Sequence, residues 1–160
     1  TIDDLKESIA NYATRAAEKL REDNLATNIM SVFLLTNHFN KKDPQYSNSA
    51  KIQFDYPTNN TIIIVKKALQ GLEKIYRKGY RYKKAGVMML NLSPISNIRG
   101  LLELDKVKSD SLMQSFDSIN VRYGSSTIHT AAEGIDKIWS AKKQKISPCY
   151  TTCFNDLLKV

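Results

Sequence analysis

The first 20 residues carry apolar side chains at intervals of three and four, the period of a helix with one buried stripe. Thr1 and Asp4 have the spacing of a capping box, in which two side chains satisfy backbone N–H groups at a helix start. The pattern therefore predicts an amphipathic helix at the start of the chain. Its apolar stripe is Ile2, Leu5, Ile9, Tyr12, Ala13, Ala16 and Leu20.

Two strand-like segments follow this helix. Residues 27–36 (TNIMSVFLLT) are rich in apolar and β-branched side chains and are too short for a typical helix. Residues 51–57 (KIQFDYP) alternate polar and apolar side chains, which is typical of a half-buried strand, and Pro57 is expected to end it. A polar loop over residues 38–50 separates the two predicted strands.

A second helical pattern covers residues 60–78, and Gly79 is placed to cap its C-terminus. Residues 85–92 (AGVMMLNL) have the composition of a third strand, which Pro94 is expected to end. The inward-facing residues of this second helix are expected to be Ile62, Val65, Ala68, Leu69, Leu72, Ile75 and Tyr76.

The order helix, strand, strand, helix, strand predicts an α+β fold. We expect an antiparallel sheet of the four-stranded type with two helices on one face, and with the first strand apparently missing. A strand before Thr1 would complete a βαββαβ arrangement, so we expect the chain to be a fragment. The uncovered face of such a sheet is free to bind a partner.

The periodicity weakens after the third predicted strand. We expect a linker over residues 94–106, a short helix near 109–121 and a β-hairpin around Gly124. The chain then divides into a domain at 1–93, the linker, and a small C-terminal domain at 107–160.

The charge of the chain indicates what kind of partner it binds. The net charge is +8, and residues 1–93 hold 15 basic against 9 acidic residues, while residues 94–160 hold 9 against 7. Basic domains of this size often bind nucleic acid or acidic lipid. No apolar run approaches the roughly 20 residues that a membrane span needs. A polyanion-binding surface is therefore expected in the first domain.

The densest charge lies at residues 74–84, where six basic residues and three tyrosines surround the predicted turn from helix to strand. A line of cations beside a sheet can bind phosphates and gain free energy from counterion release. Nothing in the segment predicts base readout. The alternative is an ordinary solvated basic turn. The basic residues are Lys74, Arg77, Lys78, Arg81, Lys83 and Lys84.

Catalytic and metal-binding patterns are weak. The chain has no phosphate-binding GxxxxGK[ST] loop, no GxSxG and no HExxH. Cys149 and Cys153, with His38 and His129, are the soft ligands that could bind zinc, and two reduced thiols are the favoured interpretation. We therefore expect binding rather than catalysis.

Four segments, in order along the chain, resemble the C-terminal half of UmuC-type Y-family translesion DNA polymerases, the DNA polymerase V group. They are long stretches rather than three-residue motifs, and the resemblance runs along essentially the whole chain. The segments are residues 11–21, 46–52, 79–89 and 147–160.

The resemblance implies that residues 1–93 are a little finger, the domain with which these polymerases grip the template–primer duplex backbone. The implied function is that of a non-catalytic, DNA-binding region of an error-prone polymerase of the SOS response and DNA repair. The family's catalytic carboxylates lie in a palm domain that precedes this region, so Mg²⁺ and catalytic residues are expected only there. A cytoplasmic, nucleoid-associated bacterial protein with no membrane contact is implied.

The resemblance and the basic segment together select the candidate DNA contacts. Lys83 and Lys84 are favoured over the helix-end pair Arg77 and Lys78. The full set is Lys83, Lys84, Arg81, Lys78, Arg77, Lys51, Asn48 and Ser49.

The family's linker carries a peptide that docks on the sliding clamp, usually starting with Gln and ending in hydrophobic residues. Here Arg99 stands in place of the Gln, and Leu101, Leu102 and Leu104 supply the apolar positions, which predicts weak clamp binding. The alternative is an apolar linker that packs back on the domain.

Two other functions remain open. One is a protein-interaction module that recruits the sliding clamp, UmuD′ or RecA, and the other is a remnant with no surviving activity.

We expect Leu102→Ala combined with Leu104→Ala to abolish capture by the sliding clamp and to leave DNA affinity unchanged, because the clamp peptide binds through its apolar side chains. Clamp pull-down and a DNA titration of the same preparation check this. Undiminished clamp capture by the double variant would exclude the linker as the clamp peptide.

Overall fold

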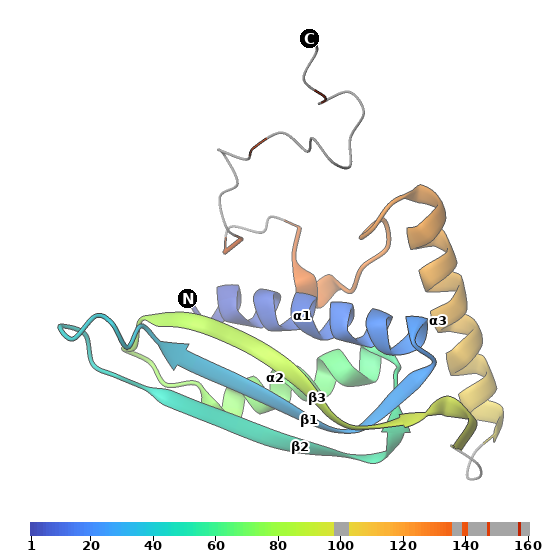
Figure 1. The fold of residues 1–160 in the computed structure, drawn as a ribbon, viewed down its shortest axis with the longest axis horizontal. Helices are drawn as coiled ribbons and strands as arrows, with labels where there is room; N and C mark the ends of the chain where they lie inside the picture. Colours follow the sequence, from blue (N-terminus) through green and yellow to red (C-terminus); the bar gives the residue numbers. More distant parts are fainter. Residues whose placement is uncertain (98–102, 136–138, 141–146, 148–156, 158–160) are drawn as a thin grey trace.

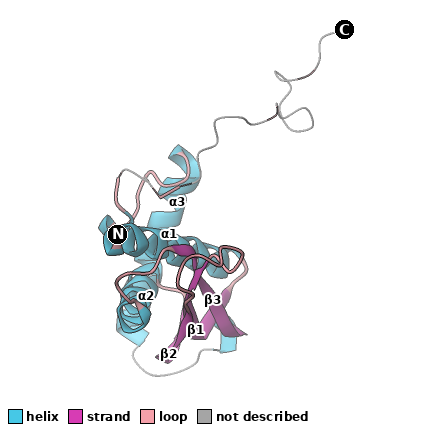
Figure 2. Ribbon diagram, turned by 90° about the vertical axis from the view of Figure 1, so that its left-hand side faces the viewer, coloured by secondary structure: helices cyan, strands magenta, loops and turns pink. Residues whose placement is uncertain are grey.

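A computed structural model describes residues 1–97, 103–135, 139–140, 147 and 157. Within these residues, three strands form one antiparallel sheet in the order β2-β1-β3, and two helices cover one of its faces (Figures 1 and 2). The predicted α+β class is confirmed, with three strands present. The elements are α1 (Ile2–Glu22), β1 (Leu25–Thr36), β2 (Ser47–Thr58), α2 (Thr61–Ile75), β3 (Tyr82–Pro94), α3 (Glu103–Tyr123) and the short 3₁₀ turns Ile95–Asn97 and Ala131–Glu133.

The first helix begins as the sequence predicts. The Thr1 hydroxyl accepts a hydrogen bond from the Asp4 backbone N–H, and the Asp4 carboxylate accepts one from the N-terminal amine. The buried stripe differs from the predicted one at more than one position. The Tyr12 ring is exposed rather than in the core, Ala16 is only half-buried, and Ala17 is fully buried instead. The fully buried apolar residues of α1 are Ile9, Ala10, Ala13 and Ala17.

The hydrophobic core lies between the two helices and the sheet. Met30, Val32 and Leu34 of β1 alternate along the strand and are fully buried against the helices. They meet Ile64 and Leu72 from α2, which are also fully buried. Side chains between these β1 positions point to the opposite face, which no helix covers (Figure 2).

The second helix ends at Ile75, three residues earlier than predicted. The Tyr46 hydroxyl donates to the Ile75 carbonyl, and the Tyr82 hydroxyl bonds both backbone groups of Arg77. These side chains satisfy groups that a longer helix would use itself. Gly79 is therefore not the helix cap and adopts a positive φ of 97° within the following turn.

Strands β2 and β3 are longer than the sequence pattern predicts. Ser47, which we expected in a loop, pairs with Leu35, and Tyr82 pairs with Thr36. Both segments are polar, so side-chain hydrophobicity does not mark them as strands. Their backbone pairing with the central strand determines the conformation.

The chain after the sheet was predicted less well. The expected helix near 109–121 belongs to the 21-residue α3, and the expected hairpin around Gly124 is wrong. The side chain of Asn120 bonds both the N–H and the carbonyl of Ile128, at 2.8 and 3.0 Å. One asparagine side chain thus takes the place of a partner strand, and the segment folds back as a turn.

Helix α3 is tied to the first domain by a buried guanidinium. Arg21 of α1 donates through Nε and Nη2 to the two carboxylate oxygens of Asp117, both at 2.6 Å. Its third nitrogen, Nη1, donates to the Asn59 carbonyl and to the Thr61 hydroxyl at 2.8 Å. One residue therefore connects α1, the start of α2 and α3.

A second connection is made by Glu133, which is only 1% exposed. Its carboxylate accepts hydrogen bonds from the Asn11 amide at 3.0 Å and from the Thr14 hydroxyl at 2.8 Å, both on α1. Close by, the ring of Trp139 packs edge-on against Tyr12, with centroids 5.8 Å apart. The 3₁₀ turn Ala131–Glu133 is thus docked on α1 by a buried carboxylate.

We expect Glu133→Ala to lower the free energy of unfolding by about 1–3 kcal/mol, because it leaves the buried donors of Asn11 and Thr14 without an acceptor. The single tryptophan of the chain, Trp139, reports the same change as a red-shifted emission. Urea unfolding and fluorescence measure both effects.

The matched control is Glu73→Ala, which removes an exposed ion pair with Lys6 (3.0 Å) and should cost no more than about 1 kcal/mol. Equal effects of the two substitutions would show that Glu133 does not hold the segment.

Candidate nucleic-acid interface

The strand register determines which side chains lie on the uncovered face of the sheet. Residues directly opposite each other on paired strands share a face. Because Met30, Val32 and Leu34 point into the core, their neighbours on β1 and the partners of those neighbours point outward. This open face carries Ser47, Ser49, Lys51 and Gln53 of β2, Ile29, Ser31, Phe33 and Leu35 of β1, and Lys84, Gly86, Met88 and Leu90 of β3.

Two of the predicted DNA contacts, Lys51 and Lys84, lie on the open face from the two outer strands. Lys51 pairs with Ser31, and Lys84 pairs with Leu35; both lysine side chains are exposed. The ring of Phe33 lies between the two outer strands and covers Gly86, where a Cβ would come within 2.6 Å of it. The open face thus combines an apolar centre with a cation on each side.

Lys83 owes its position to an irregularity in the sheet. Leu35 pairs with Lys84 and Thr36 with Tyr82, so Lys83 is an extra residue in β3. Such a bulge interrupts the alternation of the strand and changes the local twist. Two successive lysines are therefore exposed at the start of β3.

The other two predicted DNA contacts on β2, Ser49 and Asn48, lie on different faces of the sheet. Ser49 pairs with Phe33 on the open face, whereas Asn48 pairs with Leu34 on the helix side. The Asn48 amide donates to the Tyr46 hydroxyl at 3.0 Å. In this structure Asn48 positions a tyrosine, and Ser49 shares the face with the lysines.

The turn that carries Arg77, Lys78 and Arg81 is held by tyrosines. Tyr82 donates to the Arg77 carbonyl at 2.8 Å and accepts from its N–H at 2.9 Å. Burial raises the pKa of the Tyr82 phenol, so the hydroxyl stays protonated at neutral pH. The tyrosine rings contact one another at centroid distances of 4.8 to 6.4 Å; they belong to Tyr46, Tyr76, Tyr80 and Tyr82.

Tyr46 extends this cluster to the cations. The Arg77 guanidinium lies over the Tyr46 ring, 5.6 Å from its centroid. Sequence reasoning treated Tyr46 as part of a loop, and its role follows from contacts with residues about 30 positions later in the chain. The prediction that Tyr76 packs on the core is confirmed.

Sequence reasoning did not select the lysines of the β1–β2 loop, Lys41 and Lys42. The loop leaves β1 after Thr36, at the same end of the sheet where β3 begins. Arg81 approaches Asp43 of this loop at 3.8 Å, which links the loop to the α2–β3 turn. The loop joins two consecutive strands of an antiparallel sheet, and such a hairpin loop lies at one end of the sheet. That reasoning would have selected the two lysines from the sequence.

Positive charge therefore gathers at one end of the sheet. Among the described residues, Asp43 is the only carboxylate that forms an ion pair with one of these cations. We call this surface the basic end. It consists of the exposed residues Lys41, Lys42, Arg77, Lys78, Arg81, Lys83 and Lys84, and Lys51 extends it toward the middle of the sheet, opposite Ser31.

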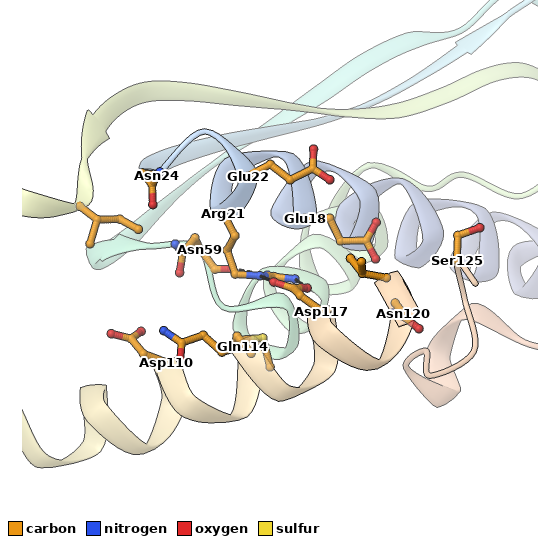
Figure 3. A pocket seen from close by; sticks show the side chains of 13 residues that line it. Glu18, Arg21, Glu22, Asn24, Asn59, Asp110, Gln114, Asp117, Asn120 and Ser125 are labelled. Carbon is orange, nitrogen blue, oxygen red and sulfur yellow. Dashed lines mark hydrogen bonds and ion pairs between the residues drawn. The ribbon is translucent and has the colours of Figure 1, made fainter. Parts of the chain in front are cut away.

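A cavity of about 560 Å³ lies away from the basic end, between α1 and α3 (Figure 3). Glu18, Glu22, Asp110 and Asp117 line it, so its character is acidic, and burial raises the pKa of Glu18. The Arg21 guanidinium inside it is already bonded to Asp117 and to the start of α2. The cavity is therefore lined by the contacts that hold α3.

Several predicted sites lie elsewhere or outside the described residues. His38 and His129 are both exposed, while Cys149 and Cys153 are not described. Over the described ranges, no three His, Cys, Asp or Glu side chains gather as metal ligands, and no helix is both long and apolar enough to cross a membrane. Of the clamp-peptide residues, Arg99, Leu101 and Leu102 lie outside the described part, and Leu104 falls within α3.

Known proteins resemble the chain over its whole length. Residues 1–101 match the impB/mucB/samB family C-terminal domain, and residues 110–160 match a domain of unknown function (DUF4113). Protein UmuC of Salmonella typhimurium is 34% identical over 99% of this chain and 38% of its own length. Protein ImpB of Salmonella typhimurium is 34% identical over 97% of this chain and 37% of its own length. Protein MucB of Escherichia coli is 34% identical over 95% of this chain and 36% of its own length. The chain thus spans little more than a third of these relatives.

Fold and surface define an α+β domain with one helix-covered sheet face and one open face that is basic at one end. The chain belongs to the impB/mucB/samB family, and its first 101 residues correspond to that family's C-terminal domain. The resemblance to UmuC-type proteins found in the sequence is confirmed.

We expect Tyr82→Phe to lower the free energy of unfolding by about 0.5–1.5 kcal/mol and to speed hydrogen exchange at the Arg77 amide, because both hydrogen bonds to Arg77 are lost. Tyr80→Phe, which leaves those bonds in place, is the matched control. Urea unfolding and amide exchange give the two readouts, and unchanged Arg77 exchange in Tyr82→Phe would contradict this role of the phenol.

Proposed function

We propose that this chain is the DNA-gripping C-terminal region of a UmuC-like translesion polymerase. Its basic end and open sheet face would lie along the backbone of the template–primer duplex. The observation that carries the proposal is the placement of Lys51 and Lys84, which reach the same open face from opposite outer strands. Family membership supports the same assignment.

The chemistry of this surface suits phosphate rather than base edges. Lysine ammonium groups are point charges, and the Ser47 and Ser49 hydroxyls between them can donate to phosphate oxygens. Binding would then be indifferent to sequence and would weaken steeply with salt, because each neutralised phosphate releases condensed counterions.

Nucleotide transfer and its Mg²⁺ are assigned in this proposal to a palm domain of the complete polymerase, and the present region holds the duplex in register. Contacts with the sliding clamp, UmuD′ or RecA belong to the linker and the C-terminal residues, apart from the basic end. Action in the SOS response, at the bacterial nucleoid, follows from the same assignment.

We expect Lys51→Glu combined with Lys84→Glu to weaken binding to a blunt duplex by roughly tenfold or more and to reduce the salt slope by about 1.8, since about 0.9 is lost with each phosphate contact. Fluorescence anisotropy over a range of salt concentrations measures both quantities.

The matched control is Lys19→Glu combined with Lys66→Glu, which changes the net charge equally on exposed positions of the two helices. If the two double variants weaken DNA binding equally, the open face is not the binding surface and net charge alone explains the affinity.

A further inference from the structure

The β1–β2 loop presents an aromatic ring that the fold does not use. Phe39 is 83% exposed and lies outside the hydrophobic core. The His38 ring lies against it, with centroids 4.0 Å apart and planes inclined by 37°. The loop projects at the left end of the molecule in Figure 1, beyond the sheet. Two adjacent rings, tilted relative to each other, thus lie exposed in the loop.

The loop that carries these rings is built by its own polar side chains. The Gln45 amide donates to the carbonyls of Asn37, Asn40 and Asp43 at 3.3, 2.8 and 3.0 Å. Its oxygen accepts from the Thr36 hydroxyl at the end of β1.

Further bonds hold the residues on either side of the ring. The Asn37 side chain accepts from the Phe39 N–H at 3.3 Å, and the Asn40 amide donates to the Asp43 carboxylate at 2.9 Å. A loop ordered before binding loses little conformational entropy when a ligand contacts its tip. The exposed ring is therefore pre-positioned for contact.

Cations surround the ring pair. Lys41 and Lys42 follow it after Asn40 and are exposed, and Arg81 is joined to the loop through Asp43. An aromatic face combined with nearby cations is the chemistry that binds single-stranded nucleic acid, with the ring stacking on a base and the cations neutralising phosphates. Paired bases inside a duplex hide their faces, so the platform needs an unpaired base, whose face is free to stack.

We propose that His38 and Phe39 form a stacking platform for an unpaired base where a DNA duplex passes into a single strand. The proposal rests on the DNA-binding function proposed above, and it adds a second element of the substrate, the single-stranded extension. Lys41 and Lys42 contact the phosphates of that strand.

The test compares two DNA ligands of equal duplex length, one blunt and one with a single-stranded extension whose first unpaired base is 2-aminopurine. The 160-residue chain is expected to bind the extended ligand more tightly and to quench the 2-aminopurine. Phe39→Ala should weaken binding to the extended ligand by about fivefold or more and abolish the quenching, and Phe39→Trp should retain both. Binding to the blunt duplex should stay unchanged in Phe39→Ala.

Tyr56→Ala removes another exposed aromatic ring, from the far end of β2, and is the matched control. Equal affinity of the unsubstituted chain for the two ligands, or equal loss for both in Phe39→Ala, overturns the stacking platform while leaving duplex binding in place. The reverse result is also informative. If the Lys51→Glu, Lys84→Glu variant loses binding to the blunt duplex but quenches 2-aminopurine normally, duplex binding and base stacking depend on different residues. A Phe39→Ala chain with normal DNA binding and normal quenching would likewise overturn the stacking platform.

Discussion

The backbone pairing of β1 with strands on both sides is the constraint on which the rest of the structure depends. It is antiparallel to β2 and to β3, and its helix-facing side chains are fully buried. Side chains alternate along a strand, so a slip of one residue would turn Met30, Val32 and Leu34 outward and bring Ser31 and the larger ring of Phe33 into the core. The free energy lost when these side chains leave the core determines the register. The register in turn determines which lysines share the open face.

A second constraint is the satisfaction of backbone groups where the regular elements end. Tyrosine hydroxyls bond the end of α2 and the turn after it, and one glutamine amide bonds three carbonyls of the β1–β2 loop. These segments carry most of the basic end. Cations on a fixed turn and a fixed loop keep their spacing. A surface that binds several phosphates at once depends on that spacing more than on any single strong contact.

The acidic and basic surfaces of the molecule are separated by the same architecture. Carboxylates collect between α1 and α3, where Arg21 and Asp117 join the helices, and the basic end lies on the sheet and its loops. The buried Glu133 docks the C-terminal segment on α1, away from the open face. A polyanion can therefore approach the open face without meeting the carboxylates of the cavity.

The sequence alone determined the order of the elements, the α+β class and the basic character of the α2–β3 turn, since helical and strand periods are local properties. It also selected Lys51, Lys83 and Lys84 as expected DNA contacts, and the structure exposes all three side chains to solvent. It could not separate Ser49 from Asn48, whose faces depend on pairing with β1, and it missed Lys41 and Lys42, whose loop meets the turn through the contact of Asp43 with Arg81. Polar strand ends such as Ser47 were likewise set by pairing with β1, and the turn held by Asn120 was set by a side-chain partner eight residues later. Local sequence patterns decide which helices and strands form. The tertiary structure decides which side chains meet, because the pairing of a strand and the face on which its side chains lie depend on a second segment of the chain.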